Sequence, residues 1–573
     1  MSKARTLGLR MALPVVLTVE VVAITALILL PPARFQWWPA AAITAGVLLL
    51  LIVTVHRRNL PGWIAALTRW RRRRRHPEPA AAAVDIAQGD LVCGVRVDEY
   101  EAVTMVRVFG KAYTPTFLRG SSVSLSTNVL PLEVLTGLLD QPGGLKLAGI
   151  DVVSSGHRVR RGEGYPPLYS TLLADRAAAG HRDTHLIVRL DLADSVAALS
   201  YRRSIGAAAA AATERIINAL QQVQIRAAAL TAEELDTALD RLGAGLADAP
   251  EPPEPEVDDY SDEDQPAREL VGARSSLSGS QTRGRTAQSV DVGWRRVNGH
   301  PGFLTTYYFS PEDITTASLQ QMWALRTDDV VQVTMLTKKR RVQSDGGGPV
   351  LVSALLRTND PQRPQQPPTL NLNTLPGDQA AAVLRAAPTA RPRIALPTRP
   401  LGDPSQLTIP IGPTGILVGA AERDNKTSIP SIQRDDMIML ALTDPQRATR
   451  VVMNTSDFYV RQLLIRAAAV GERIAIYAAD PRRWESLAQP NITVVARRQP
   501  LEFVPTIIVN DQARNAPPTG LSATVITLGR HDRGPAPDLL FEQKSRETVR
   551  ITAGKYNFDV AIVAFRQEQA WTG

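Results

Sequence analysis

MALPVVLTVEVVAITALILL (residues 11–30) and AAAITAGVLLLLIVTV (residues 40–55) are two long apolar runs near the amino terminus. A helix of about 20 apolar residues crosses the ~30 Å hydrocarbon core of a bilayer. The first run is long enough, and the second becomes so when Trp37 and Trp38 are counted as its interfacial end. The sequence therefore predicts a transmembrane hairpin with helices at about 11–30 and 38–55.

Basic residues flank the hairpin at both of its ends. Lys3, Arg5 and Arg10 precede the first run, and an arginine-rich segment follows the second, whereas the connector carries only Arg34. The positive-inside rule then places both termini in the cytoplasm. A cleavable signal peptide fits less well, because its apolar core is shorter and a second span follows at once. We expect residues 1–75 to form a two-pass membrane anchor with a basic collar.

Several hairpin residues are candidates for contacts with lipids or with other subunits. They are Glu20, Trp37, Trp38, Arg71, Arg72, Arg73, Arg74 and Arg75. Glu20 lies in the middle of the first run, where it either contacts a membrane partner or packs, protonated, against the other helix. The arginine run suits an anchor to anionic headgroups, worth ~1 kcal/mol per basic residue.

Composition limits the function of the remaining chain. The protein has 573 residues and a net charge of +9, and basic residues between 3 and 75 account for that excess. The charge therefore indicates membrane attachment and not nucleic-acid binding. Cys93 is the only cysteine, which excludes an intrachain disulfide and agrees with a reducing cytoplasm.

After the hairpin the sequence predicts cytoplasmic α/β domains. The first has two parts, residues 84–248 and 289–400, separated by an acidic and Ser/Gly-rich insertion at 249–288 that we expect to be disordered. Residues 405–573 form a separate carboxyl-terminal α/β domain.

Strand and helix signals alternate in the first of these domains. Alternating apolar residues predict strands at 91–97 and 102–108, and we also predict strands at 185–191 and 303–309. Residues 195–229 are Ala-rich and predict one long helix that begins near Asp194 and Ser195. Thr231 and Glu234 form a capping box for the next helix.

The carboxyl-terminal domain has the pattern of a parallel sheet. A strand at 450–454, a helix at 457–470 and strands at 473–477 and 492–495 make a βαβαβ unit. Segments 506–509, 523–528 and 558–564 are its further strands. The sequence thus predicts a doubly wound sheet.

Candidate chemistry is weak along the chain. The first βα turn, residues 454–457, has no glycine, and Asp457 would repel a phosphate there. His181, Asp183 and His185 would share one face of a strand and resemble metal ligands, but no further histidine except His157 is close in sequence. We therefore assign no catalytic, cofactor-binding or metal-binding residues.

Three segments resemble a known family. They are HRDTHLIVRLDLADSVAALSYRRSIGAAAAAATERIINAL (181–220), HPGFLTTYYFSPEDITTASLQQMW (300–323) and GERIAIYAADPRRW (471–484). Together with the hairpin they resemble EccE, a membrane component of the type VII (ESX) secretion system. The resemblance implies a non-catalytic assembly subunit beside EccB, the EccC ATPase and EccD, with a degenerate glycosyltransferase-like fold. The alternative is a membrane-anchored glycosyltransferase-like enzyme at the cytoplasmic face.

Overall fold

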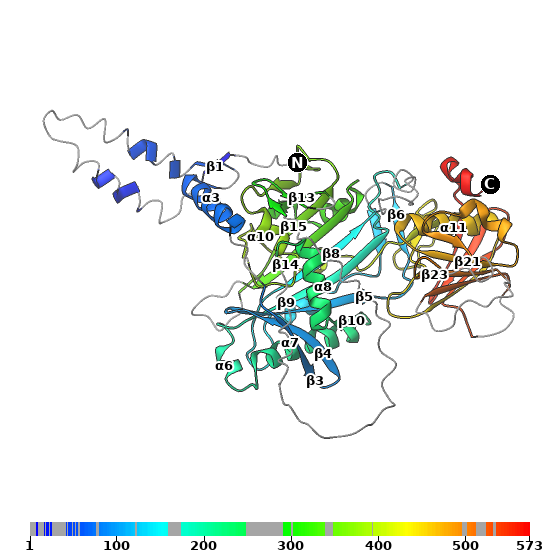
Figure 1. Cartoon of the computed structure of the whole chain (residues 1–573), viewed down its shortest axis with the longest axis horizontal. Helices are drawn as coiled ribbons and strands as arrows, with labels where there is room; N and C mark the ends of the chain where they lie inside the picture. Colours follow the sequence, from blue (N-terminus) through cyan, green and yellow to red (C-terminus); the bar gives the residue numbers. More distant parts are fainter. Residues whose placement is uncertain are drawn as a thin grey trace, which may run out of the picture.

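The computed structural model contains two large β-sheets and a helix that leads toward the amino-terminal segment (Figure 1). It describes residues 7–9, parts of 17–25 and 42–55, and residues 58–75, 80–120, 123–158, 173–247, 290–299, 302–338, 348–391, 393–495, 501–511, 523–530 and 535–572. The expected disordered insertion at 249–288 lies outside these residues. Each sheet has its own apolar core.

The first sheet is antiparallel in all of its described pairings. In spatial order its main strands are β11 (Asp291–Val292), β12 (Val297–Asn298), β13 (Phe303–Phe309), β15 (Val350–Asp360), β14 (Asp329–Lys338), β8 (Leu147–His157), β9 (His181–Asp191), β5 (Glu101–Gly110), β4 (Leu91–Val97) and β3 (Ala83–Gln88). The shorter β16 (Leu372–Thr374) and β17 (Arg399–Pro400) pair with β13 and β15. The long central strands are buried along most of their length.

Helices cover both faces of this sheet. On β9, Leu186 and Val188 join the core that contains α7 (Ile205–Gln222), whereas Ile187 joins the core of α8 (Ala232–Gly243) and α10 (Gln379–Leu384). Successive side chains of a strand point to opposite faces, so a strand covered on both faces is apolar at nearly every position. The three-layer arrangement explains why β9 does not alternate between apolar and polar residues.

The long Ala-rich helix expected over 195–229 is wrong in its extent. The segment folds as α6 (Val196–Leu199), then α7, then a strand, β10 (Arg226–Ala229). The Ser204 side chain accepts a hydrogen bond from Ala207 N at 3.0 Å and starts α7 anew. Gln224 takes a positive φ of 62°, and β10 then pairs with β5. Pairing with the sheet therefore outweighs the helix preference of the last alanines.

Other local predictions are confirmed. The strands at 91–97 and 303–309 have the expected bounds as β4 and β13, and β9 begins four residues earlier than expected, at His181. The capping box of α8 is complete. Thr231 Oγ1 accepts from Glu234 N at 3.3 Å, and Glu234 Oε2 accepts from Thr231 N at 2.9 Å.

The second sheet is parallel on one side and antiparallel on the other. The parallel strands are, in order, β22 (Ile492–Val494), β21 (Ile474–Ala478), β23 (Ile507–Asp511), β24 (Thr524–Leu528), β20 (Thr449–Asn454) and β25 (Leu539–Gln543). The antiparallel strands follow as β26 (Thr548–Ala553), β27 (Tyr556–Ala561), β18 (Ile416–Ala421), β19 (Met437–Leu440), β6 (Thr116–Arg119) and β7 (Val123–Ser126).

This sheet confirms the expected elements but not their expected arrangement. The helix at 457–470 is α11 (Asp457–Val470), and Gly471 ends it with a φ of 110° that favours glycine. Strands β23 and β24 lie between β20 and β21, and β27, expected as a further strand of the doubly wound sheet, is antiparallel. Strand β27 is antiparallel because β25, β26 and β27 are joined by short turns, whereas parallel neighbours need a longer crossover connection.

The chain passes between the two sheets more than once. Residues 116–126 leave the first sheet after β5 and form β6 and β7 of the second. Leu407, Ile409 and Ile411 return to the core of the first sheet before β18 begins. The two sheets are therefore joined by several chain segments, and a cavity lies between them.

Candidate functional site

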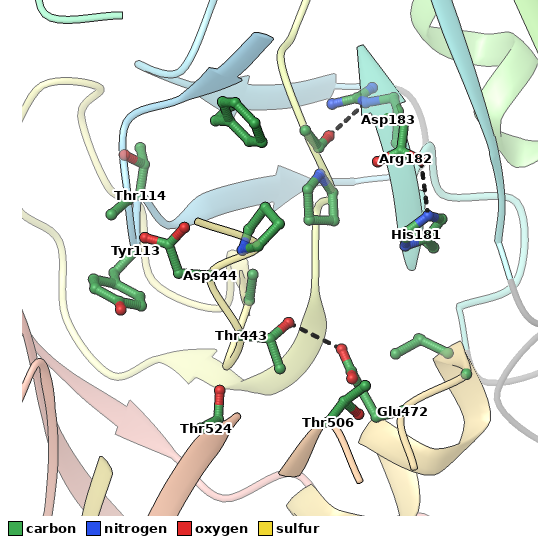
Figure 2. A pocket seen from close by; sticks show the side chains of 18 of the residues that line it. Tyr113, Thr114, His181, Arg182, Asp183, Thr443, Asp444, Glu472, Thr506 and Thr524 are labelled. Atoms are coloured by element: carbon green, nitrogen blue, oxygen red, sulfur yellow. Dashed lines mark hydrogen bonds and ion pairs between the residues drawn. The ribbon is translucent and has the colours of Figure 1, made fainter. Parts of the chain in front are cut away.

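A cavity of about 730 Å³ lies where the two sheets meet (Figure 2). One wall comes from β5, β9 and β10 of the first sheet, and the other comes from segments of the second sheet. The polar residues that line it include Arg107, His181, Asp183, Arg226, Thr443, Asp444 and Glu472. Charged side chains lie on both walls of this cavity.

Asp183 is the electrostatic centre of the first wall. Its carboxylate lies 3.1 Å from Arg107 Nη2, 3.2 Å from Arg241 Nη1 and 3.4 Å from His181 Nε2. Burial raises the pKa of Asp183, but the hydrogen bond from His181 and the positive charges around it hold that pKa well below its usual range. The same hydrogen bond raises the pKa of His181. The carboxylate is thus ionised and shared among the guanidinium groups of Arg107 and Arg241 and the His181 imidazole.

The predicted face of His181, Asp183 and His185 is only partly assembled. His181 and Asp183 meet at the cavity, and the His181 ring stacks on His157 with centroids 5.4 Å apart. His185 is buried in the sheet, and its Nδ1 has no hydrogen-bond partner within the described ranges of the chain. Among the described residues, no group of three or more His, Cys, Asp or Glu side chains could hold a metal ion.

His185 makes folding sensitive to acid. Burial lowers the pKa of its imidazole to about 3, whereas an unfolded histidine titrates at about 6.5. Between these values the unfolded chain binds the extra proton, so stability falls as the pH falls, by up to ~1.4 kcal/mol per pH unit. We expect His185→Asn to remove this loss between about pH 6.5 and pH 5, as measured by urea unfolding at each pH.

His181 supplies the control for this pH dependence. Its pKa is raised in the folded chain, so its stabilising contribution is present below about pH 6.5 and is lost as the pH rises through the folded value. His181→Asn should therefore change how the free energy of unfolding depends on pH above about pH 6.5. Below that pH the dependence should stay as in the unaltered protein. An unchanged acid side in His185→Asn would contradict the assignment.

Asp444 organises the second wall. Its Oδ2 atom lies 2.8 Å from Arg226 Nη1 on β10 and 3.4 Å from Arg447 Nε. Nearby, Thr443 Oγ1 donates to Glu472 Oε1 at 3.0 Å, as drawn in Figure 2. Arg226 belongs to the first sheet, so its bond to Asp444 joins the two sheets. Sequence reasoning missed this pair because the two residues are 218 positions apart and share no local motif.

The charged side chains of the cavity are held in ion pairs and hydrogen bonds, and the pair of Arg226 and Asp444 joins its two walls. A carboxylate that is paired with a guanidinium and has a lowered pKa is a weak general base. Asp183 is of this kind, and Asp444 is held by two arginines. The arrangement is typical of groups that fix two sheets relative to each other.

The βα turn of the second sheet is also occupied by an ion pair. Arg483 Nε donates to Asp457 Oδ2 at 2.7 Å, and its Nη1 donates to Asp511 Oδ2 at 3.0 Å. Trp484 Nε1 donates to the same Asp511 oxygen at 2.8 Å. A phosphate at the start of α11 would meet the Asp457 carboxylate and would have to displace Arg483.

The predicted arginine run lies on α3 (Leu60–Arg75), which packs against the first sheet (Figure 1). Trp294 contacts two α3 rings, with centroids 6.1 Å from Trp63 and 5.5 Å from Trp70. Trp70 Nε1 donates to Val292 O at 3.0 Å, and Arg74 Nη2 lies 3.1 Å from Asp291 Oδ1. One side of the helix therefore faces the first sheet.

The remaining predicted contact residues are placed as follows. Arg71, Arg72 and Arg74 are exposed, Arg73 is half-buried, and Arg75 is the last residue of α3. Glu20 is helical and exposed, whereas Trp37 and Trp38 lie outside the described residues. At the end of the expected second span, β2 (Val53–Val55) pairs with β1 (Leu7–Leu9). In the described part of the chain, no helix combines the length and apolar character needed to span a bilayer.

Trp294 packs α3 against the first sheet through contacts with two rings of the helix. We expect Trp294→Ala to weaken the docking of α3 by about 2 kcal/mol, because a half-buried ring with two aromatic neighbours is lost. Amide hydrogen exchange of residues 60–75 should then accelerate by a factor of ~30. Trp571→Ala is the matched control, because it removes a half-buried ring that packs against the core of the second sheet. Unchanged exchange in α3 would contradict the role of Trp294.

One of the reported relatives resembles this chain along nearly its whole length, and a family model matches its middle part. The family model described as the EccE type VII ESX secretion system translocon matches residues 178–309, from just before β9 to the end of β13. The ESX-2 secretion system protein EccE2 of Mycobacterium tuberculosis (strain CDC 1551 / Oshkosh) is 28% identical over 554 residues, which cover 92% of this chain and 91% of that protein.

Two further relatives match a shorter part of the chain. The ESX-5 secretion system protein EccE5 of Mycobacterium tuberculosis (strain ATCC 25618 / H37Rv) is 30% identical over 240 residues, 42% of this chain and 48% of that protein. The ESX-1 secretion system protein EccE1 of the same strain is 28% identical over 196 residues, 32% of this chain and 40% of that protein.

Proposed function

We infer that this chain, which belongs to the EccE family and is a component of a type VII (ESX) secretion system, acts there as a non-catalytic structural and assembly subunit. Other Ecc subunits are its partners by that membership. The specific proposal is that it contacts EccB, the EccC ATPase and EccD as a two-pass protein of the inner membrane, with both termini in the cytoplasm. The resemblance of its soluble part to a glycosyltransferase scaffold stays a prediction.

The observation that carries the non-catalytic role is the pairing of charges in the cavity between the sheets. Asp183 is held by Arg107, Arg241 and His181, and Asp444 is held by Arg226 and Arg447. A carboxyl group works best as a general acid or base when its pKa lies near the working pH. Here the pKa of Asp183 is lowered, and the bond between Arg226 and Asp444 fixes the two sheets, which suits a scaffold.

The contacts of α3 support a role in assembly at the membrane. The helix follows the predicted hairpin, and its Trp63 and Trp70 rings pack on Trp294 of the soluble body. Arg71 and Arg72 remain exposed on the other side, where they can meet anionic headgroups or a neighbouring subunit. A rigid connection of this kind would hold the cytoplasmic body at a fixed orientation to the membrane.

Affinity purification of the tagged full chain from membranes in mild detergent tests this function. We expect an ATPase and a many-span membrane protein to co-purify. Recovery of the chain alone as a monodisperse species would count against an assembly role. Calorimetric titration of the same preparation with manganese and a nucleotide sugar should give no heat of binding, and saturable binding would favour the enzyme alternative.

The export function itself can be tested with the histidines of β9. A His181→Ala/His185→Ala double variant should keep export at the level of the unaltered protein, because neither imidazole takes part in a reaction. Its abundance in the membrane has to be measured in parallel, since His185 is buried in the first sheet. Loss of export at normal abundance would contradict the non-catalytic role.

A further inference from the structure

A second cavity, of about 270 Å³, lies where α3 meets the first sheet. Trp63 of α3 forms one wall, and Tyr307 of β13 and Pro376 form another. Trp294, Arg295 and Arg296, from the connection between β11 and β12, complete it. Residues of α3 and of the first sheet thus meet at this cavity.

The charge of this cavity is positive and is not balanced from within. Arg295 and Arg296 are the charged residues among those that line it. The Nη1 atom of Arg296 is buried and has no hydrogen-bond partner among the described residues. Burial lowers the pKa of Arg296, and the charges of Arg363 and Arg295 lower it further. A buried guanidinium donor without an acceptor is costly, and an anion in the cavity would satisfy it.

The other lining groups indicate which anion fits. Burial raises the pKa of Tyr307 to about 12, so its hydroxyl is neutral and can donate a hydrogen bond. The Trp63 and Trp294 rings, 6.1 Å apart, offer apolar walls for carbon atoms beside the anionic group. Guanidinium groups bind phosphate oxygens through charge-assisted hydrogen bonds. We propose that this cavity binds a phosphate ester, either the headgroup of an anionic phospholipid or a free phosphate ester.

The position of the cavity favours the lipid source. Trp63 lies in the first turn of α3, directly after the predicted second span, so this end of the helix is the one nearest to the membrane. Arg58 also ties the start of α3 to this place, since its Nη1 donates to Pro376 O at 2.6 Å. The choice of a lipid rests on the proposed membrane attachment, whereas the phosphate chemistry rests on Arg295, Arg296 and Tyr307 alone.

The test uses the full chain, purified in a neutral detergent and stripped of lipid. Dioleoyl phosphatidylglycerol is titrated into it and bound lipid is read by native mass spectrometry, and glycerol 3-phosphate is titrated separately by calorimetry. We expect Arg296→Gln to weaken binding by about tenfold or more, because charge-assisted hydrogen bonds are lost. Arg295→Gln is a second variant, which removes an exposed charge of the site and keeps the buried guanidinium donor of Arg296.

Arg434→Gln is the matched control, because it removes the same charge from an exposed loop of the second sheet. Binding of the lipid, with or without glycerol 3-phosphate, supports a headgroup site, and binding of glycerol 3-phosphate alone supports a site for a free ester. Binding of neither probe, or equal binding by Arg296→Gln, Arg295→Gln and the control, overturns the proposal. Co-purification of other subunits is measured independently, so failure of the assembly role would leave this result standing.

Discussion

Asp151→Ala is expected to lower the free energy of unfolding by about 3–5 kcal/mol, because it leaves two buried guanidinium groups without their main partner. Asp151 lies on β8 and is 0% exposed. Its Oδ2 accepts from Arg189 Nε at 2.6 Å, and its Oδ1 accepts from Arg385 Nη2 at 2.8 Å. The nearest remaining carboxylate is Glu101, 3.6 Å from Arg189 Nη1.

Urea unfolding of the full chain in detergent measures this effect. Asp151→Asn keeps an acceptor oxygen and should lose less stability than the alanine variant. Glu542→Ala is the control, because its partner Lys544 is 3.4 Å away and both are well exposed, which makes such a pair worth at most ~1 kcal/mol. A loss of less than about 1 kcal/mol in Asp151→Ala would mean that Glu101 can neutralise Arg189 alone.

Elements with strong local signals could be predicted from the sequence. The helix of residues 457–470 begins and ends at the expected positions, because an acidic first turn and Gly471 mark its two ends. The capping box of Thr231 and Glu234 is likewise a contact between residues three apart. Such features depend on neighbours in the chain, so a single sequence contains the information that determines them.

Features that depend on pairing between distant segments could not be predicted. Residues 226–229 have the composition of a helix but form β10, because β5 offers them backbone partners. In the second sheet, β23 and β24 insert between β20 and β21, although every one of these strands was expected. Strand order is set by tertiary packing, which a propensity does not describe.

The candidate site shows the same limit. The shared face of His181 and Asp183 follows from the period of a strand, and the structure brings them into contact. The cations around Asp183 come from other elements, Arg107 from β5 and Arg241 from α8. Likewise, the contact between Trp70 and Val292 joins residues 222 positions apart. The sequence shows that these residues are present but not that they meet.

The arginine run has two sides with different roles. Sequence reasoning treats Arg71 to Arg75 as one anchor for lipid or a partner subunit. In the structure Arg71, Arg72 and Arg74 are all exposed, but Arg74 pairs with Asp291 beside the first sheet. The tryptophans and Arg74 therefore lie on the side of the helix that contacts the first sheet.

Glu568→Ala is expected to lower the free energy of unfolding of the second sheet by about 3–5 kcal/mol, because it leaves a buried guanidinium group without its carboxylate. Glu568 ends η5 (Arg566–Glu568) and is 3% exposed. It accepts two hydrogen bonds from Arg466 of α11, from Nε at 2.7 Å and from Nη2 at 2.8 Å, and a third from Gln462 Nε2 at 3.1 Å. Removing the carboxylate leaves the Arg466 guanidinium, which is 1% exposed, without a counter-charge.

The loss at Glu568 should be confined to the second sheet, since α11 and the carboxyl-terminal helix α12 (Gln569–Thr572) pack on each other there. Hydrogen exchange should therefore accelerate in α11 and leave β8 and β9 protected. In both variants Arg466 keeps the carbonyl oxygens of Leu417 and Val563 as acceptors. Glu568→Gln also keeps a side-chain oxygen that can accept from Arg466, so it should lose less stability than Glu568→Ala. Glu547→Ala, at an exposed turn, serves as the control. Equal acceleration of hydrogen exchange in both sheets would contradict a local role for Glu568 and Arg466. It would indicate that the two sheets unfold as one unit.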